Sequence, residues 1–193
     1  MSEGKSDLRI IKTRKALYTA FTTLLGEKSF EDITVNELCE KAMVRRATFY
    51  KHFADKYDFF AFFVRDTREE FSLEFPAVVT KENLNDYLLS LIQHALHYFK
   101  DNQAIIRNVL NSNALLSLVD IFSEEMYRDI LLRLNEINQG ESSSATPNKS
   151  LAAFYSGGIV RLLRLWLTNS SEITELKMLA DFQEILNAFS PLP

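Results

Sequence analysis

The hydrophobic and polar positions of this 193-residue chain follow the period of an α-helix along almost its whole length. Ile10, Leu17, Phe21 and Leu24 fall on one face of a first segment, and the basic residues nearby fall off that face. No segment shows the alternation typical of a β-strand. The predicted fold class is therefore all-α with about nine helices, at residues 10–25, 35–41, 46–53, 56–75, 84–100, 103–111, 114–138, 149–168 and 175–189.

Residues with strong positional preferences mark several helix ends. Thr34 is expected to cap the helix that follows it, with Glu37 completing a capping box. Gly26 is expected at the C-terminal cap of the first helix. Asp55 is expected at the N-cap of the fourth. The predicted elements thus have predicted boundaries as well.

The charge of the chain is unevenly distributed. The net charge of −4 gives no hint of a nucleic-acid partner, but residues 1–58 carry eleven Lys or Arg against nine Asp or Glu, whereas residues 59–193 carry eleven against seventeen. The single Cys39 excludes an intrachain disulfide and a cysteine-cluster zinc site. The longest purely apolar run, residues 59–64, is too short to span a membrane, and the polar N-terminus has no apolar signal segment. We therefore expect a cytoplasmic protein with no membrane partner.

Two short helices joined by about four residues carry the strongest functional signal. Helices this short need neighbours to pack on. The second, at residues 46–53, has Phe49 and Phe53 one turn apart as a buried anchor, and its remaining residues are polar, small or basic. This is the layout of a helix-turn-helix, whose second helix enters the major groove of DNA. Arg can pair with guanine, Thr can contact a thymine methyl, and Tyr, Lys and His can hold phosphates.

This region resembles the DNA-binding signature of the TetR family of transcriptional regulators. The resemblance covers about 50 residues and is carried by Thr34-Val35-x-x-Leu38-x-x-x-Ala42-x-Val44-x-x-Ala47-Thr48-Phe49-Tyr50-x-His52-Phe53-x-x-Lys56, with Thr13-Arg14 and Phe30 upstream. It implies a helix-turn-helix DNA-binding domain at residues 1–54. It also implies a helical domain at residues 55–193 that dimerises and often binds a small inducer.

The family's DNA contacts transfer to this chain position by position. The resemblance implies that Thr34 touches a phosphate, that the start of the second helix faces the bases, and that side chains further along hold the backbone. The base-facing set is Arg45, Arg46, Ala47 and Thr48, and the backbone set is Tyr50, Lys51, His52 and Lys56.

Two positions depart from the family pattern. Met43 replaces the usual turn glycine, so the turn must accommodate a side chain at some cost in strain. Arg45 replaces a small polar N-cap, which loses a cap but adds charge at the DNA. The Ala42-Met43-Val44-x-Arg46 variant is similar to a branch of the family common in low-GC Gram-positive bacteria.

The rest of the chain carries weaker signals for ligands. The candidate effector-binding residues are Phe63, His94, His97 and Tyr98, although partly buried helical histidines and an aromatic core would give the same pattern. No metal site is expected, because the other His and Cys lie in the DNA-binding region. No phosphate-binding loop or hydrolase motif is present, so we expect neither a cofactor nor an enzyme.

The last two helices are expected to form a dimer interface, in the position that the TetR family uses for a four-helix contact between subunits. The candidate interface residues are Phe154, Gly158, Leu162, Trp166, Leu179 and Leu186, and an intramolecular bundle is the alternative. The predicted function is a homodimeric repressor that binds a palindromic double-stranded operator in the bacterial nucleoid under control of a small-molecule effector. The alternative is a regulator whose C-terminal domain binds a partner protein instead.

Overall fold

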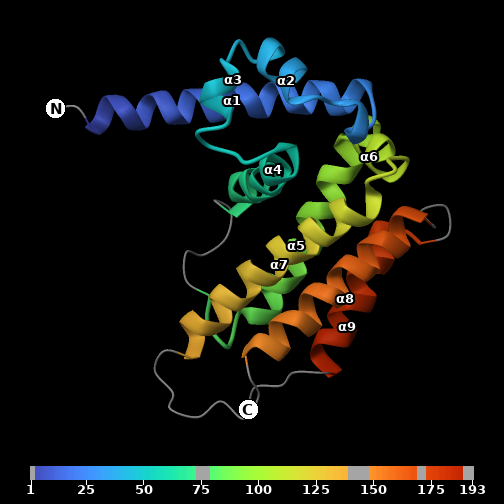
Figure 1. Ribbon diagram of the computed structural model, residues 1–193. Helices are drawn as coiled ribbons and strands as arrows, with labels where there is room; N and C mark the ends of the chain where they lie inside the picture. The colour runs from blue at the N-terminus through green and yellow to red at the C-terminus, as the bar shows by residue number, and fades with distance from the viewer. Residues whose placement is uncertain (1–2, 73–78, 139–147, 169–172, 189–193) are drawn as a thin grey trace. The chain divides into compact units, whose positions relative to one another are not determined.

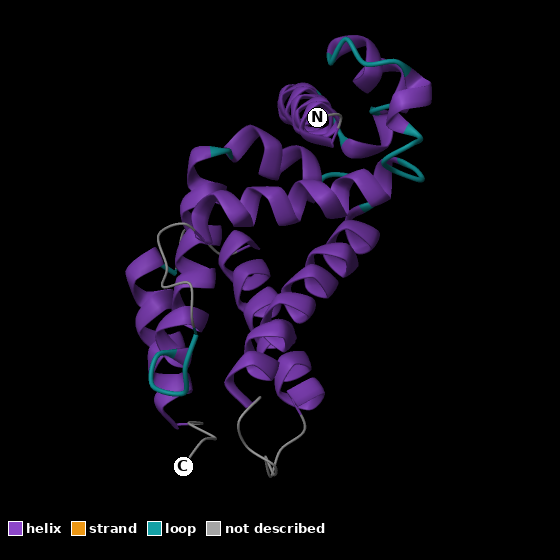
Figure 2. Cartoon of the chain, turned by 90° about the vertical axis from the view of Figure 1, so that its left-hand side faces the viewer, coloured by secondary structure: helices purple, strands orange, loops and turns teal. Residues whose placement is uncertain are grey.

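A computed structural model describes residues 3–72, 79–138, 148–168 and 173–188, and every regular element within them is helical (Figure 1, Figure 2). The all-α fold class and the nine α-helices predicted from the sequence are confirmed in this described part. In chain order the elements are α1 (Glu3–Glu27), the 3-10 helix η1 (Phe30–Asp32), α2 (Val35–Lys41), α3 (Arg46–Phe49), α4 (Lys56–Ser72), α5 (Leu84–Asp101), α6 (Gln103–Leu110), α7 (Leu115–Asn138), α8 (Asn148–Thr168) and α9 (Glu175–Ala188).

Three predicted boundaries differ from the structure. Helix α1 begins at Glu3 rather than residue 10, because its polar first turns carry no periodic signal but still extend an established helix. Gly26 lies inside the last turn of α1, and no described glycine has a positive φ, so its predicted role as a C-cap is wrong. Helix α3 ends at Phe49 rather than residue 53, and the chain continues in turns in which the N–H groups of His52 and Phe53 both donate to the Phe49 carbonyl at 2.9 Å. The predicted end of α4 at residue 75 lies outside the described residues.

The chain divides into two compact units that do not follow the boundary expected after residue 54. The first unit comprises Met1–Val64 together with Asn102–Ile121, and the second comprises Arg65–Asp101 with Phe122–Pro193. Helix α6 joins the first unit because it packs along α1, where Asn108 Nδ2 donates to the Leu25 carbonyl at 2.7 Å. A sequence motif cannot show such a contact, since 83 residues separate the two partners.

Phenylalanine rings form the core of the first unit. Phe21, Phe30, Phe49 and Phe59 are fully buried, and the ring of Phe21 meets that of Phe59 edge-on at 5.1 Å between centroids. Buried aromatic side chains supply large apolar areas and prefer this edge-to-face geometry. The core therefore holds α1, α3 and α4 together, and it fixes the orientation of a helix α3 that could not persist alone.

An apolar core formed by α5, α7, α8 and α9 holds the second unit. Leu88 and Ile92 of α5, Ile130 of α7 and Ile159 of α8 are fully buried in it, and α5 packs against both α8 and α9. No single described helix is long and apolar enough to cross a membrane, although α6 and most of α7, bent by 118°, satisfy the length and composition requirement as a pair.

Candidate nucleic-acid interface

Helix α2 is held by a cap at its start and by ion pairs to the C-terminal end of α1 and the residue that follows it. The Thr34 hydroxyl accepts from the backbone N–H of Glu37 at 3.2 Å, as predicted for the N-cap. The Glu37 carboxylate accepts from Lys28 Nζ at 2.5 Å, and Lys41 Nζ lies 3.1 Å from Glu27. These contacts direct one edge of α2 towards α1 and leave its other polar edge exposed.

The turn between α2 and α3 contains a strained residue. Met43 has a φ of 54°, in the left-handed region that residues other than glycine adopt at a cost in free energy. Its side chain is 95% exposed. The N–H of Val44 donates to the Cys39 carbonyl at 2.9 Å and closes the turn. The strain predicted from the missing glycine is thus present.

Helix α3 and the residues on either side of it expose most of the side chains that were predicted to meet DNA. Arg45 occupies the N-cap position in an extended conformation without a capping side-chain bond, and its carbonyl accepts from the Thr48 N–H at 2.8 Å. Phe49 is buried beneath the helix. Thr34, Arg45, Arg46, Ala47, Tyr50 and Lys51 are exposed, and Thr48 and His52 are half-buried. The structure therefore brings eight of the nine predicted DNA-contacting residues to the surface of a single helix-turn-helix.

Lys56 is placed differently from the other predicted contacts. Its ammonium donates to the carbonyl oxygens of Phe30, Glu31 and Ile33 at 3.0, 2.9 and 3.0 Å. Burial lowers the pKa of Lys56, and the nearby carboxylates of Glu31 and Asp32 oppose this shift. An ammonium has three hydrogens, so these bonds leave none for a phosphate. The prediction that Lys56 holds the DNA backbone is corrected here to a structural role beneath η1.

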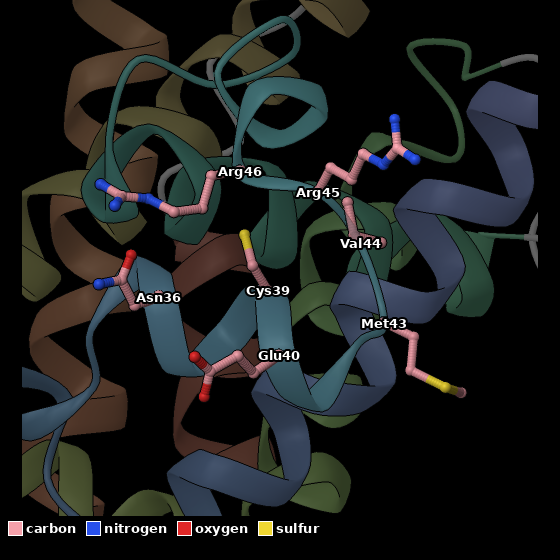
Figure 3. A pocket seen from close by; sticks show the side chains of 7 residues that line it. All are labelled: Asn36, Cys39, Glu40, Met43, Val44, Arg45 and Arg46. Atoms are coloured by element: carbon pink, nitrogen blue, oxygen red, sulfur yellow. The ribbon is translucent and has the colours of Figure 1, made fainter.

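A hollow of about 460 Å³ separates α2 from the start of α3 (Figure 3). Its lining consists of Asn36, Cys39, Glu40, Met43, Val44, Arg45 and Arg46. The side chains of Arg45 and Arg46 extend in opposite directions, and Arg46 reaches over the side that carries Asn36 and Glu40 (Figure 3). Sequence reasoning missed Asn36 and Glu40, although their i, i+4 spacing on α2 is the signal of a shared edge.

The charges of this surface are suited to DNA. Lys28 and Lys41 are neutralised by ion pairs, whereas Arg45, Arg46 and Lys51 have no ion-pair partner among the described residues. Burial raises the pKa of the Cys39 thiol below them, and the Arg46 charge opposes this shift. No group of three or more His, Cys, Asp or Glu in the described part of the chain could hold a metal ion. The exposed cations are therefore available to an anionic partner.

The predicted effector-binding residues fall in two different units and differ in burial. Phe63 belongs to the first unit, where it is 4% exposed and its ring stacks on Tyr18 at 4.8 Å, so it packs in the aromatic core of that unit. His97 lies on the exposed side of α5 with its Nε2 3.2 Å from Asp101, so it does not line an interior site. His94 and Tyr98 are half-buried in the second unit and remain candidates.

The predicted dimer residues of α8 and α9 separate into two groups. Leu186 is 2% exposed in the core of the second unit, and Leu162, Trp166 and Leu179 are partly buried against that core. The assignment of Leu186 to an interface is therefore wrong. Phe154 is 56% exposed, and a Cβ added at Gly158 would meet nothing within 4 Å. The outward face of α8 thus combines an exposed aromatic ring with an open glycine.

Comparison with known protein families identifies both parts of the chain. Residues 14–61 match a family described as "Bacterial regulatory proteins, tetR family". Residues 86–188, more than half of the chain, match a family described as "Transcriptional regulator C-terminal region". The first match includes the helix-turn-helix, and the second includes α6, α7, α8 and α9.

Individual relatives agree with these matches. The uncharacterized HTH-type transcriptional regulator YxbF of Bacillus subtilis is 44% identical over 55 residues, which are 28% of this chain and 14% of that protein. The crystal structure of Lin0861 from Listeria innocua is 27% identical with a TM-score of 0.65, and the match covers 94% of this chain and 92% of that one. Bacillus subtilis FadR in complex with stearoyl-CoA has the same fold at 18% identity, with a TM-score of 0.53 and coverage of 89% and 96%.

Proposed function

This chain belongs to the TetR family of transcriptional regulators, and on that premise we propose that it is a homodimeric repressor of a palindromic operator, released by a small-molecule effector. One observation carries the proposal. Arg46 on α3, with Arg45 just before the helix and Lys51 just after it, is exposed and has no ion-pair partner among the described residues, and the inner side of the helix is fixed by the buried Phe49 ring. A rigid helix with exposed arginines near its start suits the major groove.

Each exposed residue has a proposed role on DNA. The Thr34 hydroxyl accepts from Glu37 and keeps its own hydrogen for a phosphate oxygen. Arg46 reads a guanine by donating to the O6 and N7 atoms of the base. Arg45, Ala47 and Thr48 lie beside Arg46 at the base edges. Tyr50, Lys51 and His52 hold the sugar-phosphate backbone, which positions the helix without reading the sequence.

A twofold dimer through the outward faces of α8 and α9 explains the exposed apolar residues there. Phe154 on α8 and Leu176 on α9, 56% and 80% exposed, would be covered by the partner subunit. Gly158, which has no side chain, would allow α8 to approach the partner subunit closely. Two recognition helices would then meet half-sites one helical turn or a multiple apart, about 34–36 Å per turn, which requires a palindromic operator.

The second unit is the proposed effector-binding region. The neighbour crystallised with stearoyl-CoA has the same fold, which supports a small-molecule effector for this chain without indicating its chemical class. His94 and Tyr98 on α5, both half-buried, are the proposed contacts of the effector. A melting-temperature screen against a metabolite library would find effectors, because a ligand that binds only the folded state raises stability by mass action.

The central experiment begins with selection of binding sites for the purified protein from a random pool of duplex DNA. An enriched palindrome supports the proposal, and enrichment of no sequence overturns it. Arg46→Ala should then lose preference at one base pair per half-site, worth about 1–3 kcal/mol, while non-specific binding falls much less. Arg45→Ala is the matched comparison, since the two arginines diverge from adjacent positions (Figure 3). Loss of preference in Arg45→Ala alone would transfer the reading role to Arg45.

A further inference from the structure

The edge of α2 that carries Asn36 and Glu40 lies apart from the cap and the ion pairs that hold this helix in place. Leu38 and Cys39 are buried on the inner side of the helix, and Glu37 and Lys41 on the other edge pair with Lys28 and Glu27 at the end of α1. Asn36 and Glu40 are both exposed and lie one helical turn apart. They line the hollow of about 460 Å³ together with the start of α3.

The chemistry of this hollow suits the edges of bases rather than phosphates. Asn36, Glu40 and Arg46 lie along the same side of it (Figure 3). A carboxylate repels the phosphate backbone, whereas it accepts from the amino groups that bases present in the major groove. An asparagine amide carries both a donor and an acceptor, which match the N7 and N6 atoms of adenine.

The geometry points to Asn36 as a second base-reading residue, which pairs its side-chain amide with an adenine beside the base pair read by Arg46. This inference rests on the proposed function, because it requires α3 to lie in the major groove. Glu40 lies one turn further along the edge. Its carboxylate repels phosphate, so the hollow favours base edges over the DNA backbone. Sequence specificity then comes from both helices of the motif.

The test compares DNA sites selected from a random duplex pool by the wild-type protein, Asn36→Ala and Asn36→Gln. The wild-type consensus should contain an adenine in each half-site next to the position that depends on Arg46. Asn36→Ala should lose preference for that adenine by about 5- to 150-fold, with the dependence of log Kd on log salt unchanged. Asn36→Gln should retain part of the preference, because glutamine carries the same amide.

Circular dichroism checks that each variant is folded. Alanine at an exposed position of α2 should not disrupt the helix, because alanine has a high helix propensity. Gln93→Ala on α5, an exposed amide in the second unit, is the matched control and should leave the consensus intact. An unchanged consensus for Asn36→Ala overturns the inference while leaving the proposed function in place. Equal weakening on every sequence also overturns it, because Asn36 would then hold the backbone. If the wild-type protein selects no sequence, the proposed function fails and the inference fails with it.

Discussion

The Glu31 carboxylate accepts a hydrogen bond from the backbone N–H of Asn113 at 2.9 Å, although 82 residues separate them in the chain. Its second oxygen accepts from the hydroxyl of Ser112, a residue that is only 6% exposed. One carboxylate therefore fastens the segment between α6 and α7 to η1. These two bonds lower the pKa of Glu31, with the Asn113 N–H as the largest cause.

This contact predicts a specific dependence of stability on pH. A carboxyl whose pKa is lowered by folding stabilises the protein above its ordinary pKa of about 4.5, and this contribution is lost as the pH falls through the lowered value. Glu31→Gln should therefore lower the free energy of unfolding at pH 7, and the difference from wild type should shrink below pH 4.5. Urea unfolding from pH 7 to pH 3 measures this. A difference that stays constant with pH would show that the charge of Glu31 does not matter.

The strained turn at Met43 predicts a stabilising substitution. Its φ of 54° costs a residue with a Cβ roughly 1 kcal/mol, and glycine adopts the same conformation without this penalty. Met43→Gly should raise the free energy of unfolding by about 0.5–1 kcal/mol, measured by denaturant titration. Met43→Ala is the control, because it removes the exposed side chain but keeps the strain. Equal gains in both variants would attribute the effect to the exposed thioether rather than to the backbone.

Variants of Lys56 and Lys51 should separate an effect on stability from an effect on DNA binding. Lys56→Met removes three charge-assisted bonds to the carbonyls around η1 and should lower stability by about 1.5–3 kcal/mol. The salt dependence of DNA binding by Lys56→Met should match that of the wild type under conditions in which the variant is folded. Lys51→Met, at an exposed position, should leave the melting temperature unchanged and reduce the salt slope by about one contact. The reverse pattern would restore Lys56 to the DNA backbone.

The outward face of α8 predicts a variant with a defect in assembly alone. Phe154→Asp should leave the subunit folded, because the ring is 56% exposed, but should convert the dimer to a monomer in sedimentation at micromolar concentration. Operator affinity should fall with it, since one subunit offers only one recognition helix. Leu132→Asp on α7, where the side chain is 53% exposed, is the matched control and should remain dimeric. A wild-type protein that sediments as a monomer would refute the interface.

Local patterns in the sequence determined most of the secondary structure and the identity of the DNA-binding motif. The Thr34 cap and the buried Phe49 depend on neighbours within a few residues, so spacing predicts them, and the resemblance to a family with a glycine in this turn predicts the strain at Met43. The same holds for the exposure of Arg45 and Arg46, because the face of a helix follows from its period.

Only the tertiary structure decided which polar and apolar residues are used by the fold itself. Lys56 has the charge of a phosphate contact, but the carbonyls around η1, more than 20 residues away in sequence, take its hydrogens. Phe63 and Leu186 have the hydrophobicity expected of a pocket or an interface, but helices distant in the chain bury them. The hollow between Asn36 and Arg46 likewise exists only once α2 packs on α3. These outcomes depend on contacts between distant segments, which helical periodicity cannot encode.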